Sequence, residues 1–525
     1  MTVTSKQFTQ RQMINAWCMY DWANSAFATT ILAAVLPVYY SQVAAEGLPA
    51  ATATAYWGLG LSLSLAIVAV LSPILGTISD VARSKKRFLT AFALLGTIGT
   101  GLLVFVDMGD WLLASVLFVV ARIGFTGANV FYDALLPHIV DEEQQDAVST
   151  RGYAMGYLGG GVLLAINVLM IQFLPGNWGP RLSFLSVALW WGLFTIPILT
   201  RVPEPPAATA SLDAGENVLT VSFARIFETI KDIRRYRDLF TYLIAFLIYN
   251  DAIGTIIGMA SIYGAELGFG SVQLILALLL VQFVGIPFSL IFGRLPNGKE
   301  ARRPIFLAFI LFNLIAMPLV GIIGAQVLPQ AITGARYPLA TESQATGPQD
   351  EGSSGNLGLI MALILGVQAV GAGLAYVLGP RLFTALADSL DTKRTIVLAL
   401  VVYVVVAAWG FVLNSVIEFW MLAWMVAVVQ GGSQALSRSL YAKLSPAAKS
   451  GEFFGLFGVM EKFSAILGPL LFAGMAGLFG SSRPAILSLI LLFALGIGLL
   501  SRVDVEAGIA VARAEDARAG IPRRS

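Results

Sequence analysis

Long apolar segments alternate with short polar stretches along the whole chain. Each segment approaches the roughly 20 residues that a helix needs to cross about 30 Å of hydrocarbon. In the first half of the chain the segments lie at 16–43, 55–79, 88–106, 111–136, 153–173 and 181–200. In the second half they lie at 238–266, 271–294, 304–325, 357–380, 395–414, 417–442, 453–478 and 485–501. Barrel strands span only about 10 residues, so this pattern predicts an all-α polytopic membrane protein with about 14 helices.

The composition agrees with a membrane protein. Hydrophobic residues make up 57% of the chain and charged residues only 12%, which excludes an ordinary soluble globular protein. The formal net charge is +2 and the basic residues form no domain-wide patch, so we expect the lipid bilayer as a partner and no nucleic acid. The single cysteine, Cys18, excludes an internal disulfide.

Lysine and arginine are concentrated in every second loop. The other loops hold only Arg181, Arg336 and Arg483 near their ends. The positive-inside rule therefore predicts that the basic loops and both termini lie in the cytoplasm. We expect an integral protein of a plasma or inner membrane. The basic loops contain Arg83, Lys85, Lys86, Arg87, Arg201, Arg225, Lys231, Arg234, Arg235, Lys299, Arg302, Arg303, Lys393, Arg394, Lys443 and Lys449.

A polar stretch at 201–237 separates the two sets of segments. Its end has the pattern of an interfacial amphipathic helix. The apolar face of that helix would carry Phe223, Ile226, Phe227, Ile230 and Ile233. We therefore expect an N-terminal six-helix bundle over 1–200, a cytoplasmic linker over 201–237, a C-terminal bundle over 238–505 and a cytoplasmic tail over 506–525.

The second half contains a tandem repeat. Segment 274–295 resembles 359–382, with Gln282 and Gln368 at corresponding positions. This repeat predicts an extra transmembrane hairpin, inserted at about 296–381 of the C-terminal bundle. Chance similarity between apolar helices is the alternative.

Charged side chains interrupt several segments. A charge near the bilayer centre costs about 2.5–3.5 kcal/mol, so such residues usually face a protein interior or a water-filled transport pathway. Asp21 and Asn24 share a face of the first segment, next to Tyr20. Asn250 and Asp251 have a similar place in the first segment of the second half. Internal repeats with polar sites at their interface are typical of secondary transporters.

Two more segments carry polar stripes at helical spacing. Such stripes can also be structural hydrogen bonds between helices, worth about 0.6 kcal/mol each on average. The stripe in 111–136 consists of Arg122, Thr126, Asn129 and Asp133. The stripe in 417–442 consists of Gln430, Gln434, Ser437 and Tyr441, with Arg438 at its edge.

The loop after the second segment reads GTISDVARSKKR at 76–87. Its Gly76, Asp80 and Arg83 resemble the Gly-x3-Asp-x2-Arg signature of the major facilitator superfamily. A degenerate copy, DSLDTKR, runs from Asp388 to Arg394. The resemblance implies that these charged residues bridge neighbouring cytoplasmic helix ends and help to hold one gating state. An ordinary solvated loop is the alternative.

Four further motifs are YDWANSAF at 20–27, LVQF at 280–283, QGGSQALSRS at 430–439 and KFSAILGP at 462–469. They resemble a branch once called the unknown major facilitator family, which is related to the autophagy-linked vacuolar amino-acid effluxers. The resemblance implies a major facilitator fold of two six-helix bundles, a central cavity lined by the first and fourth helices of each half, and alternating access. The extra hairpin departs from that pattern.

These observations favour a secondary active transporter of a small polar solute, with amino acids suggested by the resemblance alone. Arg122 and Arg438 could bind a carboxylate, while Asp21, Asp133 and Asp251 could bind an ammonium group or carry a coupling proton. Arg122 could instead neutralise Asp133 permanently. The alternative function is a non-transporting membrane receptor or scaffold on the same fold.

An enzyme is not favoured. The only histidine, His138, stands beside a proline at the end of a segment, and no cluster of metal ligands or nucleophile with a base is apparent. The chain also contains no Walker-type phosphate-binding sequence, so we expect no cofactor, no metal and no ATP hydrolysis.

Overall fold

The computed structural model describes residues 8–205, 234–266, 271–333, 356–464, 467–479 and 482–520. Regular structure in these residues is helical, without a β-strand. Thirteen of the described helices are long and apolar enough to cross a membrane. The predicted all-α polytopic fold is therefore confirmed. The predicted amphipathic helix with Phe223 to Ile233 lies outside the described residues.

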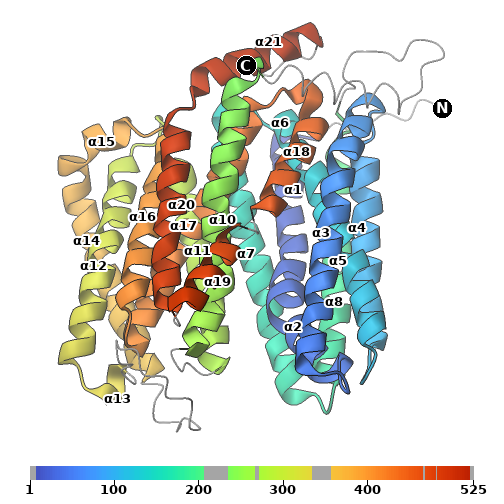
Figure 1. Ribbon diagram of the computed structural model, residues 1–525. Helices are drawn as coiled ribbons and strands as arrows, with labels where there is room; N and C mark the ends of the chain where they lie inside the picture. The colour runs from blue at the N-terminus through green and yellow to red at the C-terminus, as the bar shows by residue number, and fades with distance from the viewer. Residues whose placement is uncertain are drawn as a thin grey trace. The chain divides into compact units, whose positions relative to one another are not determined.

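The helices form two compact units (Figure 1). Unit 1 contains Met1–Phe240, Arg438–Lys462 and Asp504–Ser525, and unit 2 contains Thr241–Ser437 and Phe463–Val503. Two segments from the second half of the sequence thus belong to the first unit. The predicted domain boundaries stay a prediction, because these units are defined by contacts rather than by position in the sequence.

Unit 1 is built around six membrane-crossing segments. The first begins at α1 (Gln10–Ala26), whose capping Thr9 accepts a hydrogen bond from the N–H of Gln12, and continues through π-helical turns and α2 (Val35–Tyr39) to Ala44. Five more spans follow: α3 (Ala50–Val81), α4 (Lys85–Leu102), α5 (Trp111–Ala134), α7 (Glu142–Phe173) and α8 (Trp178–Arg201). The unit also includes α6 (Leu136–Ile139), most of α18 (Ser450–Phe463), and α21 (Val505–Arg518).

Glycines bring α7 close to α1, and this approach positions the site. A Cβ on Gly156 would lie 2.5 Å from Oγ of Ser25, and a Cβ on Gly159 would lie 2.9 Å from Cα of Trp22. Small residues at this spacing let two membrane helices pack backbone against backbone. Polar side chains of α1 therefore lie directly against α7.

Unit 2 holds most of the remaining helices. They are most of α10 (Arg237–Glu266), α11 (Ser271–Arg294), α12 (Arg303–Val327), α14 (Leu357–Leu382), α16 (Thr392–Val412), most of α17 (Val416–Leu444), α19 (Leu467–Phe479) and α20 (Ser482–Ser501). Short helices α13 (Gln330–Thr333) and α15 (Thr384–Asp388) flank α14.

One predicted span differs from the rest. The apolar segment 453–478 corresponds to two shorter helices, α18 of 14 residues and α19 of 13 residues. Neither alone has the roughly 20 residues of a full crossing. This break accounts for thirteen long helices in the described residues where about fourteen were predicted.

Candidate functional site

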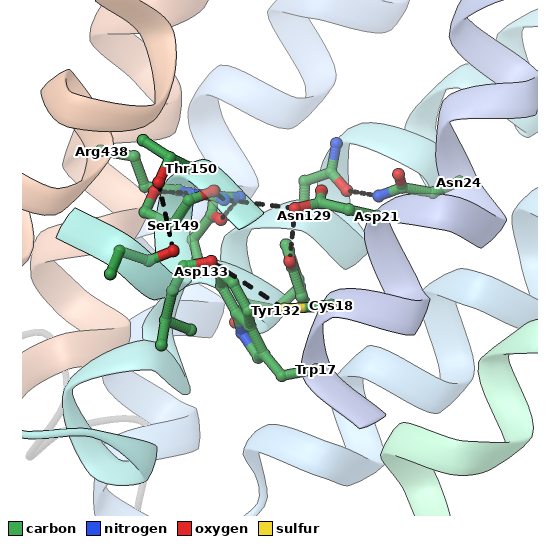
Figure 2. A network of polar contacts seen from close by, with 12 residues as sticks. Trp17, Cys18, Asp21, Asn24, Asn129, Tyr132, Asp133, Ser149, Thr150 and Arg438 are labelled. Carbon is green, nitrogen blue, oxygen red and sulfur yellow. Dashed lines mark hydrogen bonds and ion pairs between the residues drawn. The ribbon is translucent and has the colours of Figure 1, made fainter. Parts of the chain in front are cut away.

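The centre of the site is Arg438, near the end of α17 and part of unit 1. Its buried guanidinium donates through all three nitrogens. Nη1 bonds Oδ1 of Asp133 at 3.1 Å, and Nη2 bonds Oδ2 of Asp21 at 3.2 Å. Nε bonds Oγ of Ser149 at 2.9 Å, and Nη2 also bonds the Ser149 carbonyl at 3.0 Å. Figure 2 shows these side chains converging from α1, α5 and α7.

Aromatic rings and a glycine enclose this guanidinium. Its carbon lies 4.7 Å from the ring centroid of Trp17, 4.6 Å from that of Tyr153 and 5.5 Å from that of Tyr132. A desolvated cation–π contact is worth up to about 2 kcal/mol. Tyr132 also donates its hydroxyl to Oδ2 of Asp21 at 2.7 Å. A Cβ on Gly152 would lie 3.1 Å from Nη2, so glycine leaves the room that the cation needs.

The charges of this cluster do not balance. Asp21 and Asp133 share the single guanidinium, and the side chains of the two carboxylates are only 12% and 17% exposed. With both aspartates ionised, one negative charge stays uncompensated. Buried charge is costly unless it is paired, so the cluster can take up one proton or one cation.

The polar stripe of α5 continues away from this cluster. Asn24 donates from Nδ2 to Oδ1 of Asn129 at 2.6 Å. The Arg122 guanidinium lies 5.9 Å from the Phe118 ring centroid, and its Nε has no hydrogen-bond partner in the described part of the chain. Arg122 lies about 16 Å along the helix axis from Asp133, because the two stand at i and i+11. In the structure Asp133 therefore pairs with Arg438 and not with Arg122.

Tyr20 is the remaining predicted residue of α1. It is fully buried and its ring lies 4.8 Å from that of Tyr132, centroid to centroid. It therefore packs against the ring that bonds Asp21. The structure brings Asp21 and Asp133 together at Arg438 and pairs Asn24 with Asn129, whereas Arg122 lies apart from them.

A second ion pair fixes the same end of α17. Asp146 of α7 accepts from Oγ of Ser439 at 2.5 Å and from Nζ of Lys443 at 2.6 Å. The side chain of Asp146 is only 8% exposed and that of Lys443 11%. Together with Arg438, these contacts attach the last two turns of α17 to α7.

The predicted gating loop forms a third polar cluster. Asp80 pairs with Lys85, and both side chains are buried. Asp80 also accepts the N–H of Gly451 at 3.0 Å and that of Glu452 at 2.8 Å. It therefore stabilises the positive N-terminus of α18. A Cβ on Gly76 would lie 2.7 Å from the carbonyl carbon of Gly451, so the two backbones meet there.

Arg83 does not join this cluster. It has a left-handed backbone, with φ of 49°, and Nε donates to the carbonyl of Pro205 at 3.2 Å. Lys85, which sequence reasoning did not select, is the cation beside the loop aspartate.

The degenerate copy of the loop, in unit 2, is organised by a different arginine. Arg303 contacts Asp388 at 3.6 Å and donates to the carbonyls of Leu295 and Leu390 at 2.7 and 2.9 Å. Arg394 donates to the carbonyl of Ser389 at 2.5 Å. The predicted residues Asp388 and Arg394 thus lie in one turn, and buried Arg303 holds it together.

The predicted polar residues of α10 form hydrogen bonds within unit 2. Asn250 donates to Oγ of Ser464 at 2.7 Å and accepts from Nε2 of Gln434 at 2.9 Å. Asp251 is fully buried, and its Oδ2 accepts the N–H of Gly468 at 2.6 Å, at the start of α19. The predicted Gln430 is half-buried one turn from Gln434.

The C-terminal helix α21 is attached to unit 1 by polar contacts. Glu515 pairs with Arg235 and, at 3.0 Å, with Lys449, while Asp516 accepts the N–H of Ala448 at 2.9 Å. Partial burial would raise the pKa of Glu515, but the two cations outweigh it and hold that pKa below its ordinary value. The helix thus fastens the turn between α17 and α18.

Sequence reasoning missed Ser149, Asp146, Lys443 and Gly152. The first three lie near helix ends, where polar residues are expected to be solvated, so their burial has no local signal. Gly152 and Gly156 do have one, since glycines four apart on a membrane helix indicate close packing. In the described residues no group of three or more histidine, cysteine, aspartate or glutamate side chains could hold a metal ion.

Comparison with known proteins places the chain among transporters. The family model described as "Vacuole effluxer Atg22 like" matches residues 50–339 and 352–513. The MFS-type transporter YxiO of Bacillus subtilis is 33% identical over 519 residues, which is 97% of this chain and 99% of YxiO. Autophagy-related protein 22 of Yarrowia lipolytica is 24% identical, over 85% of this chain and 75% of that protein.

Among solved structures, the proton:xylose symporter XylE bound to 6-bromo-6-deoxy-D-glucose has the same fold. Its TM-score is 0.53 at 14% identity, and the match covers 96% of this chain and 98% of that chain. The predicted major facilitator fold and the predicted likeness to the vacuolar effluxers are both confirmed.

Proposed function

This chain belongs to the Atg22-like vacuole effluxer family, and we propose that it moves a small polar solute by proton-coupled alternating access. Family and fold make it a membrane transporter of the major facilitator type. The proposal adds the coupling ion and the solute class, for which we favour amino acids. It also places the protein in the cell membrane with both termini in the cytoplasm, in accord with its basic loops.

The observation that carries the proposal is the guanidinium shared by Asp21 and Asp133. One cation between two buried carboxylates leaves a negative charge that a proton would neutralise. Protonation of either aspartate would also remove one of the two ion pairs that hold Arg438. Proton binding is thereby linked to release of the end of α17 from α1, α5 and α7.

Solute binding is assigned to the neighbouring stripe. Arg122 offers a cation to a carboxylate, while Asn24 and Asn129 offer amide donors and acceptors. An amino acid could meet Arg122 with its carboxylate at one end of the stripe, or the acidic cluster with its ammonium group at the other end. The roughly 16 Å along the helix axis between Arg122 and Asp133 is too far for one small zwitterion to meet both at once. This arrangement supports an amino acid better than a neutral sugar, because guanidinium–carboxylate bonds are roughly twice as strong as neutral ones.

The test is transport by purified protein in proteoliposomes. Counterflow of radiolabelled amino acids reports exchange, and an internal pH dye reports protons moved with the solute. We expect Asp21→Asn and Asp133→Asn to keep counterflow but to lose uphill, proton-driven uptake. Asp107→Asn is the matched control, since Asp107 also pairs with an arginine, Arg181, but its side chain is 53% exposed.

Three results would contradict the proposal. Proton-driven uptake that persists in both variants would place coupling elsewhere. Counterflow by Arg122→Gln with unchanged apparent affinity would remove Arg122 from the solute site. No counterflow and no solute-induced change in unfolding temperature across a metabolite library would favour a receptor or scaffold instead.

A further inference from the structure

A long apolar groove runs between α12 and α14 in unit 2. Its volume is about 880 Å³. From Ala362 to Leu382 the α14 wall spans about 30 Å, which equals the thickness of the hydrocarbon layer. The groove includes Leu311, Ile315 and Leu319 of α12 and Val370, Leu374 and Leu378 of α14.

Small residues and one buried hydrogen bond keep the two helices together along this groove. Gly371 packs against the ring of Phe312, and a Cβ on Gly379 would lie 2.8 Å from the carbonyl oxygen of Pro304. Gln368 donates to Oδ1 of Asn313 at 2.8 Å, and both side chains are buried. The groove is therefore a fixed feature of the hairpin.

Both walls of the groove are exposed. Ile315 is 62% exposed and Val370 is 60% exposed. Only a narrow stripe of α14 is buried, and it consists of Ile360, Ile364, Gln368, Gly371, Ala375 and Gly379. Exposed apolar walls at membrane depth are suited to hydrocarbon chains rather than to a polar solute.

Basic residues gather where α12 begins and α14 ends. Arg302 and Arg381 are exposed there, and exposed Arg294 lies with its guanidinium 5.8 Å from the ring of Phe306. Asp388, a nearby carboxylate, already contacts Arg303. No ion pair of Arg294, Arg302 or Arg381 occurs within the described residues. Glu300, which accepts the N–H of Arg302 at 3.2 Å, is a second nearby carboxylate, so the end of the groove carries more positive than negative charge.

We propose that this groove binds an anionic phospholipid, with an acyl chain between α12 and α14 and the phosphate among Arg294, Arg302 and Arg381. Basic pockets at the ends of membrane helices recognise anionic headgroups in this way. Guanidinium–phosphate bonds are charge-assisted, so the site favours an anionic lipid over a zwitterionic one. The proposal is independent of the transported solute.

Native mass spectrometry of the full chain, titrated with phosphatidylglycerol or phosphatidylcholine, tests the proposal. We expect the wild type to retain phosphatidylglycerol about tenfold better, equivalent to one charge-assisted contact. The double variant Arg302→Gln/Arg381→Gln should bind the two lipids equally. Gly366→Phe should lose the retained lipid, because Gly366 lines the groove and its Cβ position is open.

Gly373→Phe is the matched control. Gly373 is on the same helix with an equally open Cβ position, but it does not line the groove. Equal retention of both lipids by the wild type would overturn the proposal, and so would equal losses in the two phenylalanine variants. A lipid-free dimer that Gly366→Phe dissociates would show that a second copy of the chain covers the groove instead.

Discussion

Asp21 of α1 and Asp251 of α10 occupy similar places in the two halves of the sequence, yet they have different partners. Asp21 shares the Arg438 side chain with Asp133. Asp251 instead accepts a backbone N–H at the start of α19. The guanidinium beside Asp21 can move away from the carboxylate when α17 moves. The partial positive charge at a helix N-terminus is instead fixed in the backbone. Neutralising the first carboxylate should therefore change function, and neutralising the second should mainly change stability.

The largest effect is expected where the shared cation is removed. Arg438→Gln leaves two buried carboxylates without their partner, and breaking a buried pair in this way costs about 3–5 kcal/mol. The free energy of unfolding in mixed detergent micelles measures the loss. Adding Asp133→Asn to this variant should restore part of it, because one buried charge is removed.

Arg181→Gln is the control for that experiment. Its partner Asp107 is half exposed, so the loss should stay below about 1 kcal/mol. Equal losses in the two arginine variants would contradict the claim that Arg438 lies in a desolvated cluster.

Asp80 combines the two kinds of partner and should give the next largest effect. Asp80→Ala removes the carboxylate from buried Lys85 and from two N–H groups at the start of α18. We expect the free energy of unfolding to fall by about 3 kcal/mol, the lower end of the range for a broken buried ion pair. Thermal unfolding measures it.

The stability of Asp80→Asn should lie between that of Asp80→Ala and that of the wild type, since its amide oxygen can still accept hydrogen bonds from the N–H groups. If the alanine and asparagine variants lose equal stability, the contacts with α18 contribute nothing and only the pair with Lys85 matters.

Asp251 provides the direct comparison with Asp21. Asp251→Ala leaves the buried N–H of Gly468 without an acceptor, which costs about 1–3 kcal/mol. Asp251→Asn retains an acceptor oxygen and should lose less. In the proteoliposome assay Asp251→Asn should keep proton-driven uptake, in contrast to Asp21→Asn. If Asp21→Asn and Asp251→Asn both lose proton-driven uptake, the two carboxylates have the same role in coupling, and the proposed difference between them is wrong.

The helices could be predicted from hydrophobicity because each span buries its backbone polar groups by itself, whatever its neighbours are. The ends of α11 and α20, at Arg294 and Ser501, agree with the predicted segments. The break between α18 and α19 was missed, since both parts are apolar. Spacing also placed Asn24 and Asn129 each on a polar face of its own helix, and in the structure the two side chains form a hydrogen bond.

The partners of the charged residues could not be predicted in the same way. Arg438 is separated from Asp21 by 417 positions, and no local pattern encodes such a pairing. Asp251 matches the spacing of Asp21, but it accepts a backbone N–H, a donor that every residue type except proline carries. A backbone partner leaves no trace in composition or spacing. The sequence therefore identified which charged side chains are costly to bury. It did not identify the partners that stabilise each of them in the folded protein.

The smallest effect should come from a carboxylate outside the membrane. Ion pairs with Lys449 and Arg235 hold the pKa of Glu515 below its usual value of about 4.3. A lowered pKa means that Glu515 stabilises the fold at pH values above about 4.3, and this contribution disappears as the pH falls through the pKa of the folded state. Glu515→Gln should therefore lose about 0.5–1 kcal/mol at neutral pH and nothing at strongly acidic pH.

Unfolding of the wild type and Glu515→Gln across that pH range checks this expectation. Glu506→Gln is the control, because Glu506 is an exposed carboxylate in the first turn of the same helix. A difference between wild type and Glu515→Gln that persists at acidic pH would show that packing of the side chain, rather than its charge, fastens α21. Transport by Glu515→Gln should equal that of the wild type. Variants of the buried Asp21 and Asp133 should in contrast differ from the wild type in transport.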